Sequence, residues 1–124
     1  MAIRQAEKSA KRAKVEDLAH FMLEDVSKLS AVNLPPIHFA YDLGCFYLLR
    51  KIQMKGYISG LGKVMVNGGL FLLNAFTPRK QGRKIVGFDV ETVKDLFGDT
   101  FDLEMVSEHS YWRFPAIWYW LRKL

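Results

Sequence analysis

The sequence has little cysteine and no long apolar stretch. A single cysteine, Cys45, leaves no partner for an internal disulfide and is typical of a protein from a reducing compartment. No apolar run reaches the roughly 18 residues that a transmembrane helix needs. Residues 1–14 also lack the apolar centre of a secretory signal. We therefore expect a cytoplasmic protein that does not span a membrane.

Motifs of the common enzyme classes are missing as well. His20, His38 and His109 are far apart, and without HxxxH or CxxC spacing a metal site is not expected. Neither GxSxG, HExxH nor the phosphate-binding GxxxxGK[ST] occurs. Residues 60–62 (GLG) are too short for a dinucleotide fingerprint and fall within a predicted helix. Motif spacing alone therefore identifies no catalytic residue.

The excess of basic residues, a net charge of +5, raises the question of nucleic acid. The charge gathers in two places: Lys8, Lys11, Arg12 and Lys14, and then Arg79, Lys80, Arg83 and Lys84. Neither cluster interleaves aromatic residues, as single-strand binders do. We therefore expect solvated charged faces and no nucleic-acid partner. A basic nucleic-acid-binding module stays a weaker alternative, which steep salt dependence of binding would support.

What the sequence does contain is the material of one folded domain over residues 1–124. Hydrophobic residues make up 50% and charged residues 25%, a globular balance rather than a disordered one. Residues 2–14 predict an amphipathic helix. Residues 15–29 fit either a continued helical period or, at HFML (20–23), a short buried strand. After the break at NLPP (33–36), residues 37–41 (IHFAY) predict a strand followed by a turn.

The second half alternates in the same way. Residues 51–65 predict a helix ended by Asn67-Gly68-Gly69, with a buried stripe of Ile52, Ile58, Leu61 and Met65. The apolar run 69–76 (GLFLLNAF) predicts a strand covered on both faces, and 77–83 a polar loop. Asp89 is the expected N-cap of a helix through Phe97. Residues 100–110 and 111–124 predict two further strands, which gives an α/β domain with a parallel centre and an antiparallel end.

In open α/β sheets, ligands bind outside the carboxyl ends of the parallel strands. Here those ends carry Glu24-Asp25, residues 42–46 and residues 74–76. A carboxylate there can accept a hydrogen bond from an adenine amino group or from a ribose hydroxyl. An exposed Phe46 and Tyr47 can contact a flat substrate. Caps and core aromatics explain the same residues equally well. Cys45 is a nucleophile only with a lowered pKa and a nearby base, and is more often a small packing residue.

These segments, taken together along essentially the whole chain, resemble class I S-adenosylmethionine-dependent methyltransferases. The similarity is greatest to the small-molecule branch of thiopurine and tellurite-resistance enzymes. AIRQAEKSAKRAKV resembles the helix after the family's second strand, FMLEDVSKL its third strand and acidic motif, and HFAYDLGCFYLL its fourth strand. LGKVMVNGGLFLLNAF resembles the helix, the proline-glycine-glycine turn and the fifth strand, with Val66-Asn67 replacing lysine-proline. FPAIWYWLRKL resembles the closing strand.

The resemblance implies a truncated Rossmann-like sheet, mostly parallel with an antiparallel C-terminal strand and with helices on both faces. It implies S-adenosylmethionine as cofactor and a small molecule as substrate. The residues that it places near the cofactor are Asp25, Val26, Asp42 and Leu43, and those near the substrate are Cys45, Phe46, Tyr47 and Asn74.

The sequence departs from the family at its cofactor loop. An acidic residue with Gly-x-Gly after a first strand is absent, and so are the first two strands. In the family's strand order, residues 37–41 would then expose an unpaired edge, which we expect a second copy to cover in a homo-oligomer. Residues 15–29, without their strand neighbour, are expected to take the helical alternative. The isolated chain is expected to be a poor methyltransferase that self-assembly or a partner completes. The alternative is a non-catalytic oligomeric remnant of the fold.

Overall fold

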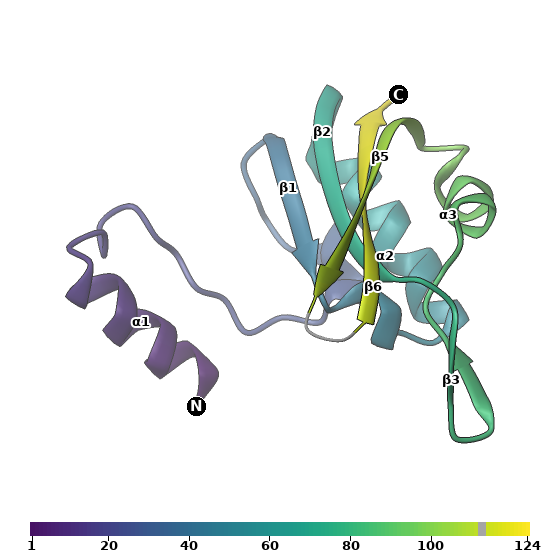
Figure 1. Ribbon diagram of the computed structural model, residues 1–124. Helices are drawn as coiled ribbons and strands as arrows, with labels where there is room; N and C mark the ends of the chain where they lie inside the picture. Colours follow the sequence, from purple (N-terminus) through teal and green to yellow (C-terminus); the bar gives the residue numbers. More distant parts are fainter. Residues whose placement is uncertain (112–113) are drawn as a thin grey trace.

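The computed structural model describes residues 1–111 and 114–124 (Figure 1). Residues 112–113, part of the predicted closing strand, lie outside the described residues. In chain order the elements are α1 (Ala2–Arg12), the 3₁₀ helix η1 (Val26–Ala31), β1 (Ile37–Leu43), the 3₁₀ turn η2 (Phe46–Leu48), α2 (Lys51–Val64), β2 (Met65–Phe76), β3 (Arg79–Gln81), β4 (Lys84–Val86), α3 (Val90–Phe97), β5 (Phe101–Tyr111) and β6 (Phe114–Lys123).

The main sheet has the strand order β1-β2-β6-β5. β1 and β2 run parallel, with Phe39 opposite Leu70 and Leu43 opposite Asn74. β6 is antiparallel to both of its neighbours, β2 and β5. The predicted α/β class, with a parallel centre and an antiparallel end, is confirmed. The antiparallel part is larger than predicted, because β5 joins it beside β6.

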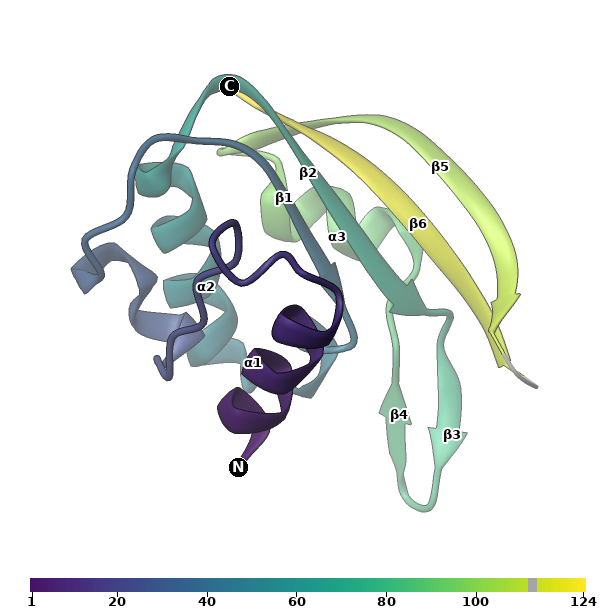
Figure 2. The same cartoon turned by 90° about the vertical axis from the view of Figure 1, so that its left-hand side faces the viewer.

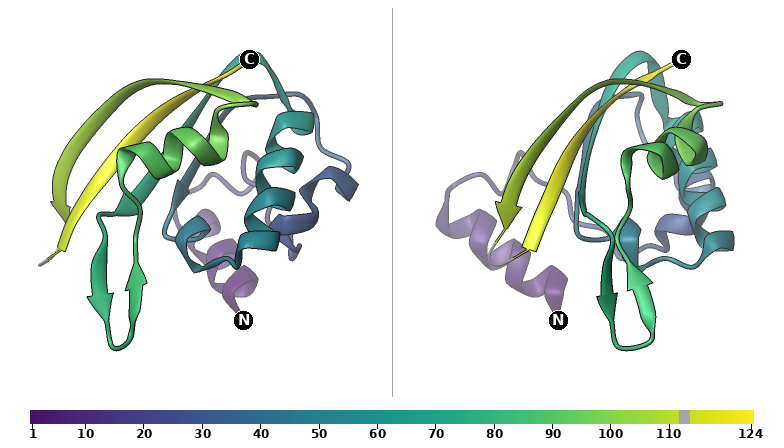
Figure 3. Two further views of the ribbon diagram at one scale, coloured as in Figure 1. Left: turned by 90° about the vertical axis from the view of Figure 1, so that its right-hand side faces the viewer. Right: turned by 45° about the vertical axis from the view of Figure 1, so that its right-hand side comes forward.

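One face of the sheet packs against α2 and α3, which lie together in front of it in the left view of Figure 3. Alternate residues of the two central strands supply this core: Phe71, Leu73 and Ala75 from β2, and Ile117, Tyr119 and Leu121 from β6. The intervening residues face the other way. Trp118 and Trp120, which pair with Asn74 and Leu72, lie on that second face. The second face of the sheet is turned toward the viewer in Figure 2. α1 stands away from the sheet, and residues 13–25 connect it without a helix or strand.

η1 is held close to α2 by two glycines one turn apart. A Cβ added to Gly56 would lie 2.3 Å from the carbonyl oxygen of Ser27, and one added to Gly60 would lie 2.7 Å from Cβ of Leu29. Real Cβ atoms do not come so near, so both positions require glycine for this packing. These two glycines therefore allow η1 to pack closely on α2.

Residues 15–29 take neither form predicted for them. HFML is not a strand, and the continuous helix is also absent, because residues 19–25 form no regular structure and only η1 is helical. Phe21, Met22 and Leu23 are all exposed, Leu23 by 89%. A strand here would need a neighbour to accept its backbone hydrogen bonds, and β1 pairs only with β2 among the described residues.

α2 ends earlier and buries a different stripe than predicted. Its last residue is Val64, and Met65 already begins β2, so Gly68 takes its left-handed φ of +82° inside the strand rather than as a helix cap. Ile58, Leu61 and Met65 are buried as predicted, but Ile52 is 75% exposed. Met54 and Tyr57 occupy core-facing positions instead, four residues before Ile58 and Leu61 respectively.

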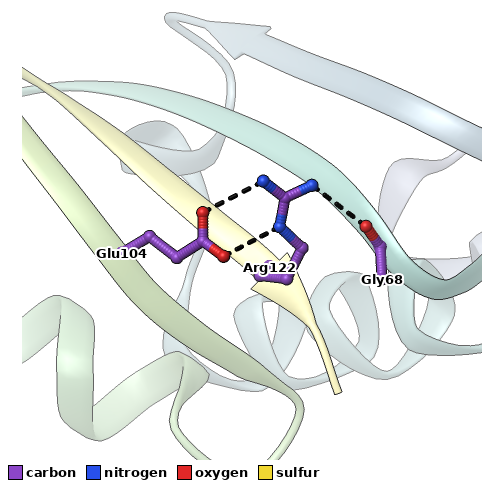
Figure 4. Close-up of polar contacts among 3 residues, drawn as sticks. All are labelled: Gly68, Glu104 and Arg122. Atoms are coloured by element: carbon purple, nitrogen blue, oxygen red, sulfur yellow. Dashed lines mark hydrogen bonds and ion pairs between the residues drawn. The ribbon is translucent and has the colours of Figure 1, made fainter.

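The remaining elements agree with the predicted helices and strands, except for a hairpin within the predicted loop and an irregularity in β5. The predicted loop at 77–83 contains strand β3 and the turn of a β3–β4 hairpin. The Asp89 cap of α3 is confirmed, since its Oδ1 accepts from the Thr92 amide at 2.8 Å. β5 carries an irregularity between Leu103 and Met105, where Glu104 pairs with Arg122 at 2.9 and 3.0 Å. Arg122 also donates to the Gly68 carbonyl at 3.0 Å, which ties β5, β6 and β2 together (Figure 4).

Among residues 1–111 and 114–124, the longest and most apolar helices still fall short of what crossing a bilayer requires.

Candidate functional site

The C-terminal ends of β1 and β2 lie side by side, because Leu43 is the parallel partner of Asn74. We call this end of the sheet the carboxyl edge. Six of the predicted site residues lie at it or in the turn that follows β1: Asp42, Leu43, Cys45, Phe46, Tyr47 and Asn74. The fold therefore gathers most of the predicted site residues at one end of the parallel pair, where ligands of open α/β sheets bind.

Asp42 is the most tightly held of these residues. It is 6% exposed, and its carboxylate accepts three hydrogen bonds: from the Cys45 amide at 2.8 Å, the Phe46 amide at 3.1 Å and the Tyr57 hydroxyl at 2.6 Å. The two amides shape the turn after β1, and Tyr57 joins that turn to α2. Since a carboxylate offers about four acceptor positions, little capacity remains for a ligand. Its cofactor role stays a prediction.

The surroundings of Asp42 shift the two neighbouring titratable groups. Burial, and then the Asp42 charge, raise the pKa of Tyr57 far above its ordinary value of 10.0, so its hydroxyl keeps its proton and donates. Burial raises the pKa of the Cys45 thiol above its ordinary value of 9.0, and the negative charge of Asp42 raises it further by a smaller amount. Cys45 therefore lacks the lowered pKa that a nucleophilic cysteine needs at neutral pH. It is exposed rather than packed in the core.

The two aromatic residues of the turn have different surroundings. Phe46 is 1% exposed and packs against Tyr57, Phe88 and Phe97 at ring-centroid distances of 5.2, 5.5 and 5.2 Å. Of the two alternatives left open for Phe46, the core aromatic is the one the structure shows, because its ring fills the core between sheet and helices. Tyr47 is half-buried and meets the ring of Phe76 edge-on at 5.6 Å. Of the pair, only Tyr47 keeps part of its surface exposed at the carboxyl edge.

Asn74 is 7% exposed and lies on the second face of the sheet. Its Nδ2 forms a hydrogen bond of 2.7 Å with Nε2 of His109. The imidazole stacks on Trp118 at 5.9 Å between ring centroids, with 22° between the planes. A depression of about 350 Å³ begins beside this pair and is lined by Thr77, Glu108, His109, Ser110, Pro115 and Ala116.

Asp25 and Val26 lie on another element. Asp25 caps η1, accepting at Oδ1 from the amide and hydroxyl of Ser27 at 2.9 and 2.7 Å. These two hydrogen bonds lower the pKa of the exposed Asp25 carboxyl, and the bond from the Ser27 hydroxyl has the larger effect. Val26 packs against the core, and among the described residues no hydrogen bond or ion pair joins either residue to the carboxyl edge. Leu43 is 57% exposed. Cofactor contacts of these residues stay predictions.

Three residues of the site were not anticipated from the sequence. Tyr57, His109 and Trp118 come from α2, β5 and β6, so only the tertiary structure brings them to Asp42 and Asn74. The polar pattern gave one hint for His109, the alternation of Met105, Ser107 and His109 on one face of β5. Tyr57 carried no such signal, because its apolar ring suits a core position whatever its hydroxyl does.

No family model matches the sequence, and no curated protein matches it either. Solved structures do match in fold. A protein studied for the conversion of a disulfide bond into a thioacetal group during echinomycin biosynthesis aligns with TM-score 0.71 at 13% identity, over 93% of this chain and 61% of its own. Burkholderia thailandensis 1,6-didemethyltoxoflavin-N1-methyltransferase, solved with S-adenosylhomocysteine, aligns with TM-score 0.63 at 14% identity, over 77% and 48%.

The N-methyltransferase NodS from Bradyrhizobium japonicum WM9, in complex with S-adenosylhomocysteine, aligns with TM-score 0.62 at 12% identity, over 97% of this chain and 62% of its own. The chain has a methyltransferase-like α/β fold. It spans between 48% and 62% of the length of these three structures.

Proposed function

We propose that this chain is part of an S-adenosylmethionine-dependent methyltransferase acting on a small molecule, and that self-assembly or a partner completes its cofactor site. Support comes from the fold shared with methyltransferases solved with S-adenosylhomocysteine. The observation that carries the need for completion is β1, which ends the sheet with no strand on its outer side among the described residues.

The outer strand β1 has the properties of an interface. Phe39, Tyr41 and Leu43 are exposed by 53%, 67% and 57%, and within residues 1–111 and 114–124 the backbone groups on its outer side have no partner strand. A bare apolar edge is a template for pairing with another chain. A second copy, or a partner that adds a strand here, would place its own residues beside Asp42 and the turn after β1. We propose homo-oligomer formation through this edge.

The small-molecule substrate would meet the carboxyl edge. Tyr47 offers an outward aromatic ring there, and Asn74 with His109 offers hydrogen-bonding groups beside the 350 Å³ depression. Since positioning accounts for much of the rate enhancement in such transfers, the chain alone, without a glycine-rich cofactor loop, should transfer methyl groups poorly.

A second candidate function is a non-catalytic oligomeric module that retains the fold. Two observations favour it. The Asp42 carboxylate is engaged by its own chain, and the pKa of the Cys45 thiol is raised rather than lowered. Titration of S-adenosylhomocysteine into protein of known mass separates the candidates. Micromolar binding by an assembled form is expected from the enzyme, and no binding at millimolar ligand would leave only the oligomeric module.

A further inference from the structure

The hairpin after β2 carries a dense positive charge into solvent. Residues 79–86 form the β3–β4 hairpin, here called the basic hairpin, with Arg79, Lys80, Arg83 and Lys84 and no acidic residue. It projects beyond the carboxyl edge of the sheet (Figures 1 and 2). Lys80, Arg83 and Lys84 are exposed. Among the described residues none of the four cations forms an ion pair, so their charge is free to attract an anion.

The root of the basic hairpin is fixed to the sheet. Phe88 donates its amide to the Phe76 carbonyl at 2.8 Å, and Thr77 donates its amide to the Pro115 carbonyl at 3.2 Å. Gly87 closes the root with a φ of +95°, and a Cβ there would come within 2.4 Å of the Thr77 carbonyl oxygen. The charges are therefore presented from a defined place rather than from a free loop.

Aromatic rings gather at this root, although the sequence near the hairpin does not interleave them. Phe114 of β6 meets Phe76 edge-on at 6.1 Å, and Phe76 meets Tyr47 at 5.6 Å. We call Tyr47, Phe76 and Phe114 the aromatic cluster. Phe114 is 41% exposed. The guanidinium of Arg79 lies 3.8 Å from the centre of the Phe114 ring and 5.1 Å from that of Phe76, so a cation is already stacked on the cluster.

We propose that the basic hairpin and the aromatic cluster form a binding site for single-stranded nucleic acid. The cations would follow the phosphodiester backbone, and a base would stack on the exposed ring of Phe114 beside Arg79. A positively charged arm joined to stacking rings is the combination by which proteins bind single strands without reading sequence. The reason for expecting no nucleic-acid partner, the lack of interleaved aromatics, applies to the sequence but not to the folded chain.

The test uses fluorescence anisotropy with a labelled oligouridine of about 12 nucleotides, a length within the range that single-strand-binding modules cover. Binding is expected to weaken steadily between about 50 and 200 mM salt. If the three exposed cations neutralise phosphates, log affinity against log salt should have a slope of roughly −2, at about −0.7 per phosphate. Absence of binding at the lowest salt would overturn the proposal. The assay contains no cofactor, so it is independent of the proposed methyltransferase function.

A charge-removing variant identifies the site. The hairpin variant carries Lys80→Gln, Arg83→Gln and Lys84→Gln, and should bind roughly tenfold more weakly with a flatter salt slope. The matched control removes the same charge from α1 through Lys8→Gln, Lys11→Gln and Arg12→Gln, and should bind like the native chain. Equal weakening of both variants would show a general charge effect and overturn the site.

The stacking part is tested separately. Phe114→Leu keeps an apolar side chain at a partly exposed position, and circular dichroism confirms that the variant folds. Its affinity is expected to fall by at least roughly fivefold, and the salt slope should stay unchanged, because stacking and charge act independently. Native affinity in this variant would overturn the role of the aromatic cluster. An RNA duplex of the same length should bind more weakly than the single strand, and tighter duplex binding would overturn the preference for single strands.

Discussion

Asp42 shows how a residue placed for chemistry in the sequence serves structure in the fold. In the sequence it follows the strand predicted at residues 37–41, in the position where open α/β sheets hold ligands, and this made it a candidate for the cofactor. In the structure its carboxylate accepts from two amides of the turn and from the Tyr57 hydroxyl. A buried carboxylate needs such donors, since an unsatisfied one is costly. The turn after β1 therefore depends on Asp42 for its shape.

Replacement of Tyr57 by Phe tests this dependence. The change removes the hydroxyl that donates to Asp42 at 2.6 Å and leaves the ring in the core. The loss of one donor to a buried charged group should cost about 1–3 kcal/mol in the free energy of unfolding, measured by urea denaturation. Tyr41→Phe is the control, since Tyr41 is 67% exposed, and it should change stability by less than about 0.5 kcal/mol. Equal stability of the Tyr57→Phe and native proteins would contradict the account.

The site was predictable from the sequence only where its residues are local. Asp42 lies at the end of β1, and Cys45 and Tyr47 lie in the turn directly after it, so the predicted end of this strand was enough to identify all three as candidates. The burial of the Phe46 side chain could not be predicted from the sequence, because the 3₁₀ turn after β1 determines which ring enters the core. Partners from other elements, such as His109 for Asn74, require the strand order, which pattern alone does not give.

At the scale of elements, helices and strands with a strong period were predicted and the weak segment at 15–29 was not. α1, β1, α3 and β5 fall close to their expected bounds. The segment before β1 carries apolar residues that fit both periods, and its final form depends on a contact that sequence does not show. That contact is the close approach of η1 to α2 at Gly56 and Gly60.

Gly56→Ala tests the packing of η1 on α2. The added methyl would lie 2.3 Å from the Ser27 carbonyl oxygen, so η1 must move, at a cost of about 1–3 kcal/mol for overpacking. Alanine favours the helix by about 1 kcal/mol, so the net loss expected in the free energy of unfolding, measured in urea, is about 0–2 kcal/mol. Ser59→Ala, an exposed position of the same helix, serves as control and should be neutral or slightly stabilising. A stabilised Gly56→Ala protein would show that η1 does not pack at this distance.

At the scale of the whole molecule, the sheet is covered unequally. α2 and α3 bury one face, whereas the outer strand β1 and the second face carry exposed apolar side chains that include Phe39, Tyr41 and Met105. Proteins commonly protect such edges with charge, bulges or a partner. Among the described residues no strand pairs with the outer side of β1, which is the basis for the proposed assembly.

Tyr41→Lys tests assembly through β1. A lysine on this outer strand adds charge where a second strand would pair, so the mass measured by light scattering should fall toward that of one chain, 14.3 kDa. Ile52→Lys is the control, because it makes the same kind of change at a 75% exposed position of α2. That control should keep the mass of the native assembly. Equal masses for native, Tyr41→Lys and Ile52→Lys proteins would argue against the edge as the interface.

The most direct test of the proposed function is calorimetric titration of S-adenosylhomocysteine into native and Tyr41→Lys proteins whose masses are known. Micromolar affinity corresponds to about 8 kcal/mol of binding free energy, and millimolar affinity to about 4 kcal/mol. The account predicts micromolar binding by the native assembly and no heat from the single-chain variant at millimolar ligand. Micromolar binding by the single chain would contradict the need for assembly, and no binding by either protein would contradict a cofactor site.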